Sequence, residues 1–147
     1  MMIIVEGVIA GILAGVLMGL ASEACFRVRL FKSSLILVDG EFLFRTLNMK
    51  PGDRTRYIVG TVIHLITSGV FGGIYIAATH LVALTPLSAL LVSIYFFVLW
   101  LSMLLIALPI AGQGLLGRKA GSATWFEQLT LHIVFGAGYY AALRIMM

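Results

Sequence analysis

Apolar residues fill four long stretches of the chain, and charged residues are confined almost entirely to the segments between them. No Asp, Glu, Lys or Arg occurs from residue 57 to residue 117. A helix needs about 20 apolar residues to cross a bilayer, so this stretch has room for two crossings and a turn. One further apolar stretch precedes it and another follows it. The pattern predicts an all-α integral membrane protein with spans at about residues 2–24, 57–82, 86–109 and 123–146.

Basic residues predict how these spans are oriented. Nine of the ten lie in two segments between spans: seven in residues 24–57 and two in residues 110–122, with none in the short turn 83–85. Because loops rich in Lys and Arg stay on the cytoplasmic side, we expect both loops in the cytoplasm and both termini outside. The expected fold is one four-helix transmembrane domain over residues 1–147, an up-down bundle with a long cytoplasmic first loop. We expect it in the bacterial inner (cytoplasmic) membrane.

Composition agrees with this class of protein and excludes others. The chain is 61% hydrophobic and only 11% charged, whereas soluble domains carry roughly 25% charged residues. The net charge of +4 reflects topology and contact with anionic lipids, so we expect no nucleic-acid partner. Cys25 is the one cysteine, which excludes an internal disulfide, and we expect no metal site. The first apolar segment lacks a basic start and a small-x-small cleavage site, so we expect a retained helix.

The first loop, residues 25–56, is patterned rather than a plain linker. Asp39 is the expected N-cap of a short amphipathic helix, which the run Pro51-Gly52-Asp53 ends. The alternative is a surface loop that packs on the bundle. Four residues would share the apolar face of the helix among the lipid headgroups: Phe42, Leu43, Thr46 and Leu47.

Glycines recur every fourth residue in the first span, at Gly7, Gly11, Gly15 and Gly19. In water each costs a helix about 1 kcal/mol relative to alanine. In lipid, small residues let helix backbones approach closely. We therefore interpret the stripe as a helix-packing interface of the glycine-zipper kind. Its partner stays open: another helix of this chain, a second copy, or a different subunit.

Two histidines fall well inside predicted spans, away from their outer ends: His64 in the second and His132 in the fourth. Both lie about 10–13 Å from the cytoplasmic start of their span at 1.5 Å per residue, so we expect the two rings at one depth. An ionisable residue inside a membrane is a functional hypothesis by default. The pair is our candidate cofactor site, because two imidazoles can bind haem iron at both axial positions. The alternative is two neutral histidines, hydrogen-bonded to Ser, Thr, Tyr or Gln within the bundle.

Aromatic residues near the predicted span ends are expected in the membrane interface. His80, near the outer end of the second span, is expected there too. The aromatic set is Tyr57, Trp125, Tyr139 and Tyr140.

The remaining sequence motifs do not indicate a nucleotide-binding or catalytic site. The sequence GQGLLG at residues 112–117 matches G-x-G-x-x-G, but that fingerprint binds dinucleotides only between a strand and a helix. Here it follows a span that ends near Pro109, so we expect a turn. No nucleophile triad, paired carboxylate or phosphate loop falls within the spans. We therefore expect no catalytic residue and no enzyme activity.

The order of motifs carries a loose resemblance. It comprises the glycine-rich first span, a mid-span histidine, W-x-x-x-L-L-x-x-L-P-x-x-G-x-G from Trp100 to Gly114, and H-x-x-x-G from His132. In this it resembles uncharacterised small four-span bacterial membrane proteins. That resemblance implies the fold and no activity.

These observations favour a non-catalytic small subunit of a larger membrane complex, such as an energy-converting one. Its helices would pack against partner helices, lipid or pigment, with no cofactor of its own. The expected partners are membrane lipids and other membrane subunits or copies of this chain. Two alternatives stay open. One is a b-type haem electron carrier through His64 and His132, and the other is a homo-oligomeric channel or transporter for small solutes.

Overall fold

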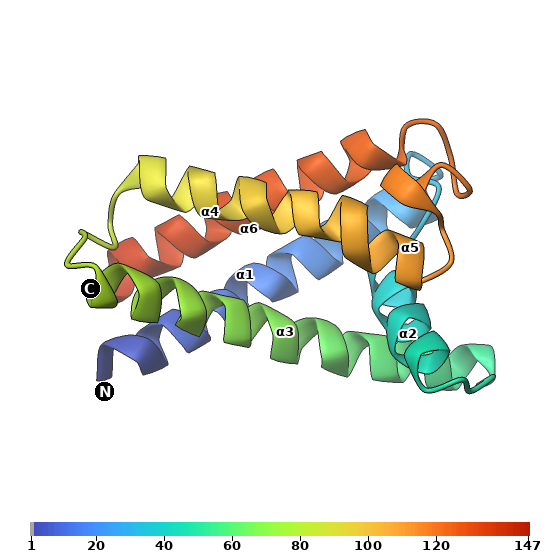
Figure 1. The fold of residues 1–147 in the computed structure, drawn as a ribbon, viewed down its shortest axis with the longest axis horizontal. Coiled ribbons are helices and arrows are strands. Elements are labelled where there is room, and N and C mark those ends of the chain that lie inside the picture. The colour runs from blue at the N-terminus through green and yellow to red at the C-terminus, as the bar shows by residue number, and fades with distance from the viewer. Residues whose placement is uncertain (1) are drawn as a thin grey trace.

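The computed structural model describes residues 2–147, which are almost entirely helical, with no strand in that range (Figure 1). Four helices are long and apolar enough to cross a membrane. They are α1 (Met2–Arg27), α3 (Asp53–Leu81), the continuous helix of α4 (Ala89–Ser102), η1 (Met103–Ala107) and α5 (Leu108–Ile110), and α6 (Thr124–Met146). A shorter helix, α2 (Leu35–Thr46), precedes α3. Each predicted span coincides with one long helix, so the all-helical class and the four apolar helices are confirmed.

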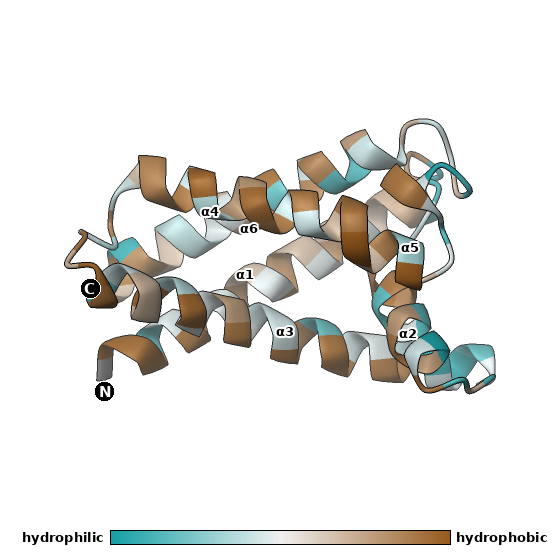
Figure 2. Ribbon diagram, in the orientation of Figure 1, coloured by the Kyte–Doolittle hydropathy of each residue, from teal (hydrophilic) through white to brown (hydrophobic). Residues whose placement is uncertain are grey.

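The long helices lie side by side and alternate in direction (Figure 1). Helix α1 packs against α3 and α6, α4 packs against α6, and α2 packs against α3. Helix α2 and residues 111–123 lie at one end of the bundle, which we call the basic end. The chain termini and the connection between α3 and α4 lie at the other end. Hydrophilic residues gather at the basic end (Figure 2).

The outer surface of the bundle is apolar. Large hydrophobic side chains stay exposed along every long helix, including Leu20 (65%), Leu90 (69%) and Ile133 (63%). A soluble monomer rarely exposes continuous apolar surface, and such surface marks contact with membrane or protein. This arrangement fits an integral membrane protein.

The glycine stripe of α1 faces α3. A Cβ atom on Gly11 would overlap the main-chain oxygen of Ser68, and one on Gly7 would lie 2.9 Å from the main-chain oxygen of Gly72. A Cβ on Gly15 would overlap the Ser68 side chain. Gly19 differs, because its Cβ would meet the nearest neighbour at an ordinary 3.5 Å. The stripe is therefore used within the chain, at the α1–α3 interface.

A π-helical turn, η1, interrupts the third long helix just before Pro109. Proline has no N–H to donate, and its ring clashes with the carbonyl four residues earlier. The wider π turn accommodates this break within one continuous helix. It also buries Met103 and Leu104 and lines the cavity described below.

One expectation for α2 was wrong. Ser34, not Asp39, is the residue before its first turn, and Asp39 lies in the middle of the helix. The apolar face expected among the lipid headgroups stays a prediction. Leu47 of that face follows the helix and is 55% exposed. The buried residues of α2 are Leu35, Ile36, Val38, Gly40 and Phe44.

The interfacial position expected for Tyr139 was also wrong. Its side chain is completely buried, and its hydroxyl donates to the main-chain oxygen of Gly72 at 2.7 Å. Because Gly72 has no side chain, its carbonyl oxygen is accessible to a side chain from α6. Tyr139 also packs edge-on against Tyr75, with ring centroids 5.6 Å apart. The tyrosine therefore joins α6 to α3 inside the bundle.

Candidate functional site

A histidine and an acid from different helices meet inside the basic half of the bundle. His64 Nδ1 lies 2.9 Å from Asp39 Oδ2, and His64 Nε2 lies 3.0 Å from the main-chain oxygen of Gly15. A carbonyl only accepts hydrogen bonds, so Nε2 must carry a proton. The remaining proton lies between Nδ1 and the carboxyl group. Whether it resides on nitrogen or on oxygen, the pair has no net charge.

Two glycines bring α2 close enough to α3 for this pairing. A Cβ atom on Gly60 would overlap the main-chain oxygen of Ile36, and one on Gly40 would overlap the main-chain oxygen of Arg56. Asp39 is next to Gly40, and His64 lies one helical turn after Gly60. The Gly40–Gly60 contact therefore sets the distance between the acid and the imidazole.

The start of α2 is fixed from α1. The Leu35 N–H donates to Ser22 Oγ at 2.9 Å, which satisfies one of the amide groups that a helix start leaves unpaired. Both groups are buried. Helix α2 is therefore held by α1 at its start and by α3 along its length.

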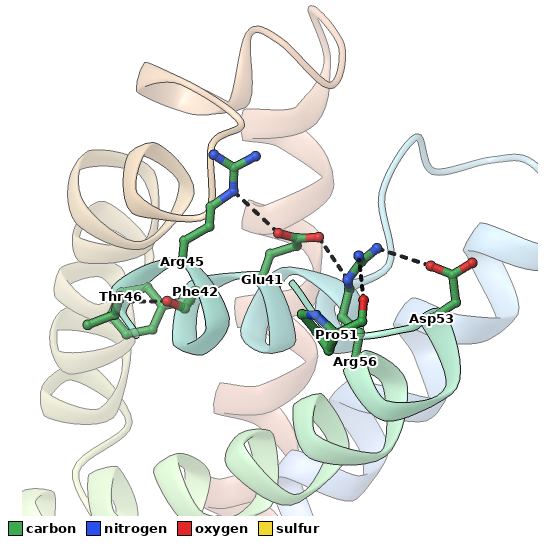
Figure 3. A network of polar contacts seen from close by, with 7 residues as sticks. All are labelled: Glu41, Phe42, Arg45, Thr46, Pro51, Asp53 and Arg56. Carbon is green, nitrogen blue, oxygen red and sulfur yellow. Dashed lines mark hydrogen bonds and ion pairs between the residues drawn. The ribbon is translucent and has the colours of Figure 1, made fainter. Parts of the chain in front are cut away.

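A polar network outside the pair secures the far part of α2 (Figure 3). Arg56 Nε lies 2.9 Å from Glu41 Oε1, and Arg56 Nη1 lies 3.3 Å from Asp53 Oδ1. Glu41 also pairs with Arg45 at 3.3 Å. Exposed ion pairs each contribute little, but these link α2 to the first turn of α3. They hold the helix that carries Asp39 over His64.

Burial raises the pKa of the Asp39 carboxyl, and the hydrogen bond and charge interaction with His64 oppose that rise. A raised pKa means that the folded protein holds the carboxyl proton more tightly than the unfolded chain does. This favours the arrangement in which the pair keeps its shared proton and stays neutral overall.

A cavity of about 200 Å³ borders the pair. Residues of α1, α2, α3, α4, α6 and the π turn line it. Two of its hydroxyl groups are already bonded within their own helices: Thr67 donates to the main-chain oxygen of Ile63 at 2.8 Å, and Ser102 donates to that of Leu99 at 2.8 Å. The polar side chains in its wall are Asp39, His64, Thr67, Ser68, Ser102 and His132.

His132 supplies an unpaired polar atom of this cavity. Its Nδ1 lies 2.8 Å from the main-chain oxygen of Gln128 and must therefore donate. In the neutral imidazole Nε2 is then a bare acceptor, and it makes no hydrogen bond to any residue from 2 to 147. Within the same residues Ser68 Oγ and Asp39 Oδ1 also make no hydrogen bond, so the wall of the cavity holds further free polar atoms. Both predicted histidines line the same cavity, although they come from different helices.

The haem hypothesis needs an imidazole nitrogen free on each side of the iron. His64 has none, because Asp39 and Gly15 occupy both of its ring nitrogens. Within residues 2–147 there is also no group of three or more His, Cys, Asp or Glu that could hold a metal ion. The arrangement does not fit axial ligation by His64, and we derive no chemistry through a haem group.

Ser68 lines the cavity beside this pair, which raises the question of a nucleophile triad. A triad needs the imidazole Nε2 on the serine hydroxyl. Here Nε2 bonds to the Gly15 carbonyl. The geometry assigns no catalytic step, and the expectation of no enzyme activity stays a prediction.

The remaining sequence candidates lie outside the cavity. The GQGLLG segment is a turn that contains three glycines at positive φ, Gly112, Gly114 and Gly117. His80 is exposed near the far end of α3. Glu127, in the first turn of α6, is buried and accepts the Lys32 N–H at 3.1 Å. This carboxylate ties the first loop to the start of α6.

Compared with known proteins, the chain matches no family model, no curated protein and no solved structure. The resemblance to small four-span bacterial membrane proteins stays a prediction.

Proposed function

We propose that this is a bacterial inner-membrane protein, with its basic loops in the cytoplasm, that binds a small uncharged organic molecule within the bilayer. The observation that carries the proposal is the free Nε2 acceptor of His132. His132 lines a cavity that the neutral Asp39–His64 pair also lines.

Charge narrows the class of ligand. A charged group buried away from water is costly unless an opposite charge pairs with it. In this cavity Asp39 is already paired with His64, and neither His132 in its neutral form nor the hydroxyl groups supply a counter-charge. The free acceptor on His132 requires a donor, so the cavity suits an uncharged molecule that carries a hydroxyl group.

The subunit expectation rested on the absence of a catalytic constellation together with a glycine stripe and a patterned loop. The stripe packs on α3 within the chain, and the loop helix α2 packs there too. Membership of a larger complex and the channel alternative stay predictions. A haem carrier through His64 does not fit, because both ring nitrogens of His64 are hydrogen-bonded.

Binding of phenol tests the proposal, with benzene as the control of similar shape and no hydroxyl group. We expect phenol to shift the ¹⁵N resonance of His132 Nε2 saturably in protein labelled at histidine and reconstituted in nanodiscs. Benzene should not produce that shift. The variant Ser102→Leu fills the cavity and should abolish it.

Val98→Leu is the control, because Val98 lies on the same helix, is more than half exposed and lies outside the cavity lining. It should leave phenol binding unchanged. Equal shifts with phenol and benzene, or no saturable shift with either, would overturn the proposal. A phenol response that Ser102→Leu leaves intact would overturn it as well, because phenol would then bind elsewhere.

A further inference from the structure

A second hollow lies on the outer face of the bundle, between α4 and α6. It is a groove of about 330 Å³ with an almost wholly apolar lining. Phe97 and Ile133 on its walls are more than half exposed. Gly136 keeps it deep, since a Cβ there would lie 3.0 Å from the Phe96 ring. The groove therefore opens where lipid would surround the protein.

The groove and the inner cavity share one residue, His132. His132 therefore borders two neighbouring hollows, and the linings of both are mostly apolar. From His132 the groove follows α6 to Tyr140, a distance of about 12 Å at 1.5 Å per residue. That length suits an alkyl chain of about ten carbons.

We propose that the ligand is a single-chain lipid with a hydroxyl head group. Its head donates a hydrogen bond to His132 Nε2 at the edge of the cavity, and its chain lies in the α4–α6 groove. This inference rests on the proposed function and names the class of molecule. It joins three observations: an unpaired acceptor, a cavity without net charge, and an apolar groove that meets that acceptor.

The acceptor on His132 and the missing counter-charge guide the choice of head group. An ester, a ketone or a methyl ether has no hydrogen to donate to Nε2. A carboxylate has neither a donor nor a counter-charge, because Asp39 already occupies His64. A protonated amine brings a charge that nothing in the cavity compensates. A hydroxyl group donates to Nε2 without bringing a charge.

Fluorescence of Trp100 tests the proposal, because Trp100 lines the groove. The chain has two tryptophans, so Trp125→Phe leaves Trp100 as the single emitter. The probe is 6-bromododecan-1-ol, whose bromine quenches a nearby indole, and its methyl ether is the control without a donor. We expect saturable quenching by the alcohol that unbrominated 1-dodecanol relieves. The ether should bind about tenfold more weakly.

Two matched substitutions locate the chain. Ala137 lines the groove, whereas Ala141 lies about one turn further along α6 and lines a different hollow. Ala137→Leu should abolish the saturable quenching and Ala141→Leu should preserve it. His132→Phe keeps a ring but removes the acceptor, and should weaken binding of the alcohol to the level of the ether.

Each outcome separates this inference from the proposed function. If phenol binds the cavity but the brominated alcohol shows only unsaturable quenching, the lipid proposal is wrong and the cavity proposal stands. If neither binds, both are wrong. Equal affinity for alcohol and ether, equal effects at Ala137 and Ala141, or indifference to His132→Phe would each overturn the lipid proposal.

Discussion

Replacing Gly11 with alanine adds a single methyl group at the tightest part of the α1–α3 interface. That methyl would overlap the main-chain oxygen of Ser68 and lie 3.1 Å from Gly72 Cα. Both neighbours are helix backbone, so neither can rotate away. The helices must therefore separate, by about 1 Å to reach ordinary contact between heavy atoms.

The cost follows from that separation. A gap of 0.5–1 Å removes roughly a quarter to a half of the dispersion energy of each affected contact. Overpacking of a core by one methylene group typically costs about 1–3 kcal/mol. Because the obstacle is main chain, we expect Gly11→Ala to reduce the free energy of unfolding by about 2 kcal/mol.

Gly19→Ala is the matched control on the same helix and stripe. Its methyl group would meet His64 Cδ2 at 3.5 Å, an ordinary contact. Removing a helical glycine can add up to about 1 kcal/mol of helix stability, so this variant should be neutral or slightly stabilising. Equilibrium unfolding in mixed micelles titrated with SDS measures both variants. Equal losses for the two would show that α1 does not meet α3 in this register.

Two further predictions concern orientation and the buried pair. In a Cys25→Ser background, cysteines at Lys50 and Arg118 should resist an impermeant thiol reagent in intact cells, while one at Thr85 reacts; labelling at residue 50 from outside would reverse the topology. Asp39→Asn should lower the free energy of unfolding by less than about 1 kcal/mol in the same assay, because the amide N–H can donate to His64 Nδ1. Asp39→Leu leaves that nitrogen without a partner and should lower it by about 1–3 kcal/mol. Equal costs would mean that the pair makes no hydrogen bond.

Hydropathy predicted the long helices because each needs only an uninterrupted apolar run, which is a local property. It did not predict their ends. Helix α3 begins at Asp53, four residues before the expected span, and α1 continues to Arg27. Backbone hydrogen bonding continues into polar sequence, so hydropathy marks the apolar layer rather than the helix.

The site was harder to predict, because its parts meet through packing. Residue counting from the span ends put His64 and His132 at one depth, and both line one cavity. Asp39 was missed, since its pairing depends on a contact between Gly40 and Gly60 that no local pattern reports. The signal available in the sequence was one acid, Asp39, which follows four apolar residues and precedes a glycine. The partner of Tyr139 was missed because it is a main-chain carbonyl.

Helix α2 carries Asp39 and is not one of the four long apolar helices. With the basic loops in the cytoplasm, as we propose, the acid of the buried pair does not have to cross the lipid during insertion. We expect the four long helices to enter the membrane with a neutral imidazole at position 64 and α2 to dock afterwards. On that order, the wall of the cavity that Asp39 supplies would be completed last.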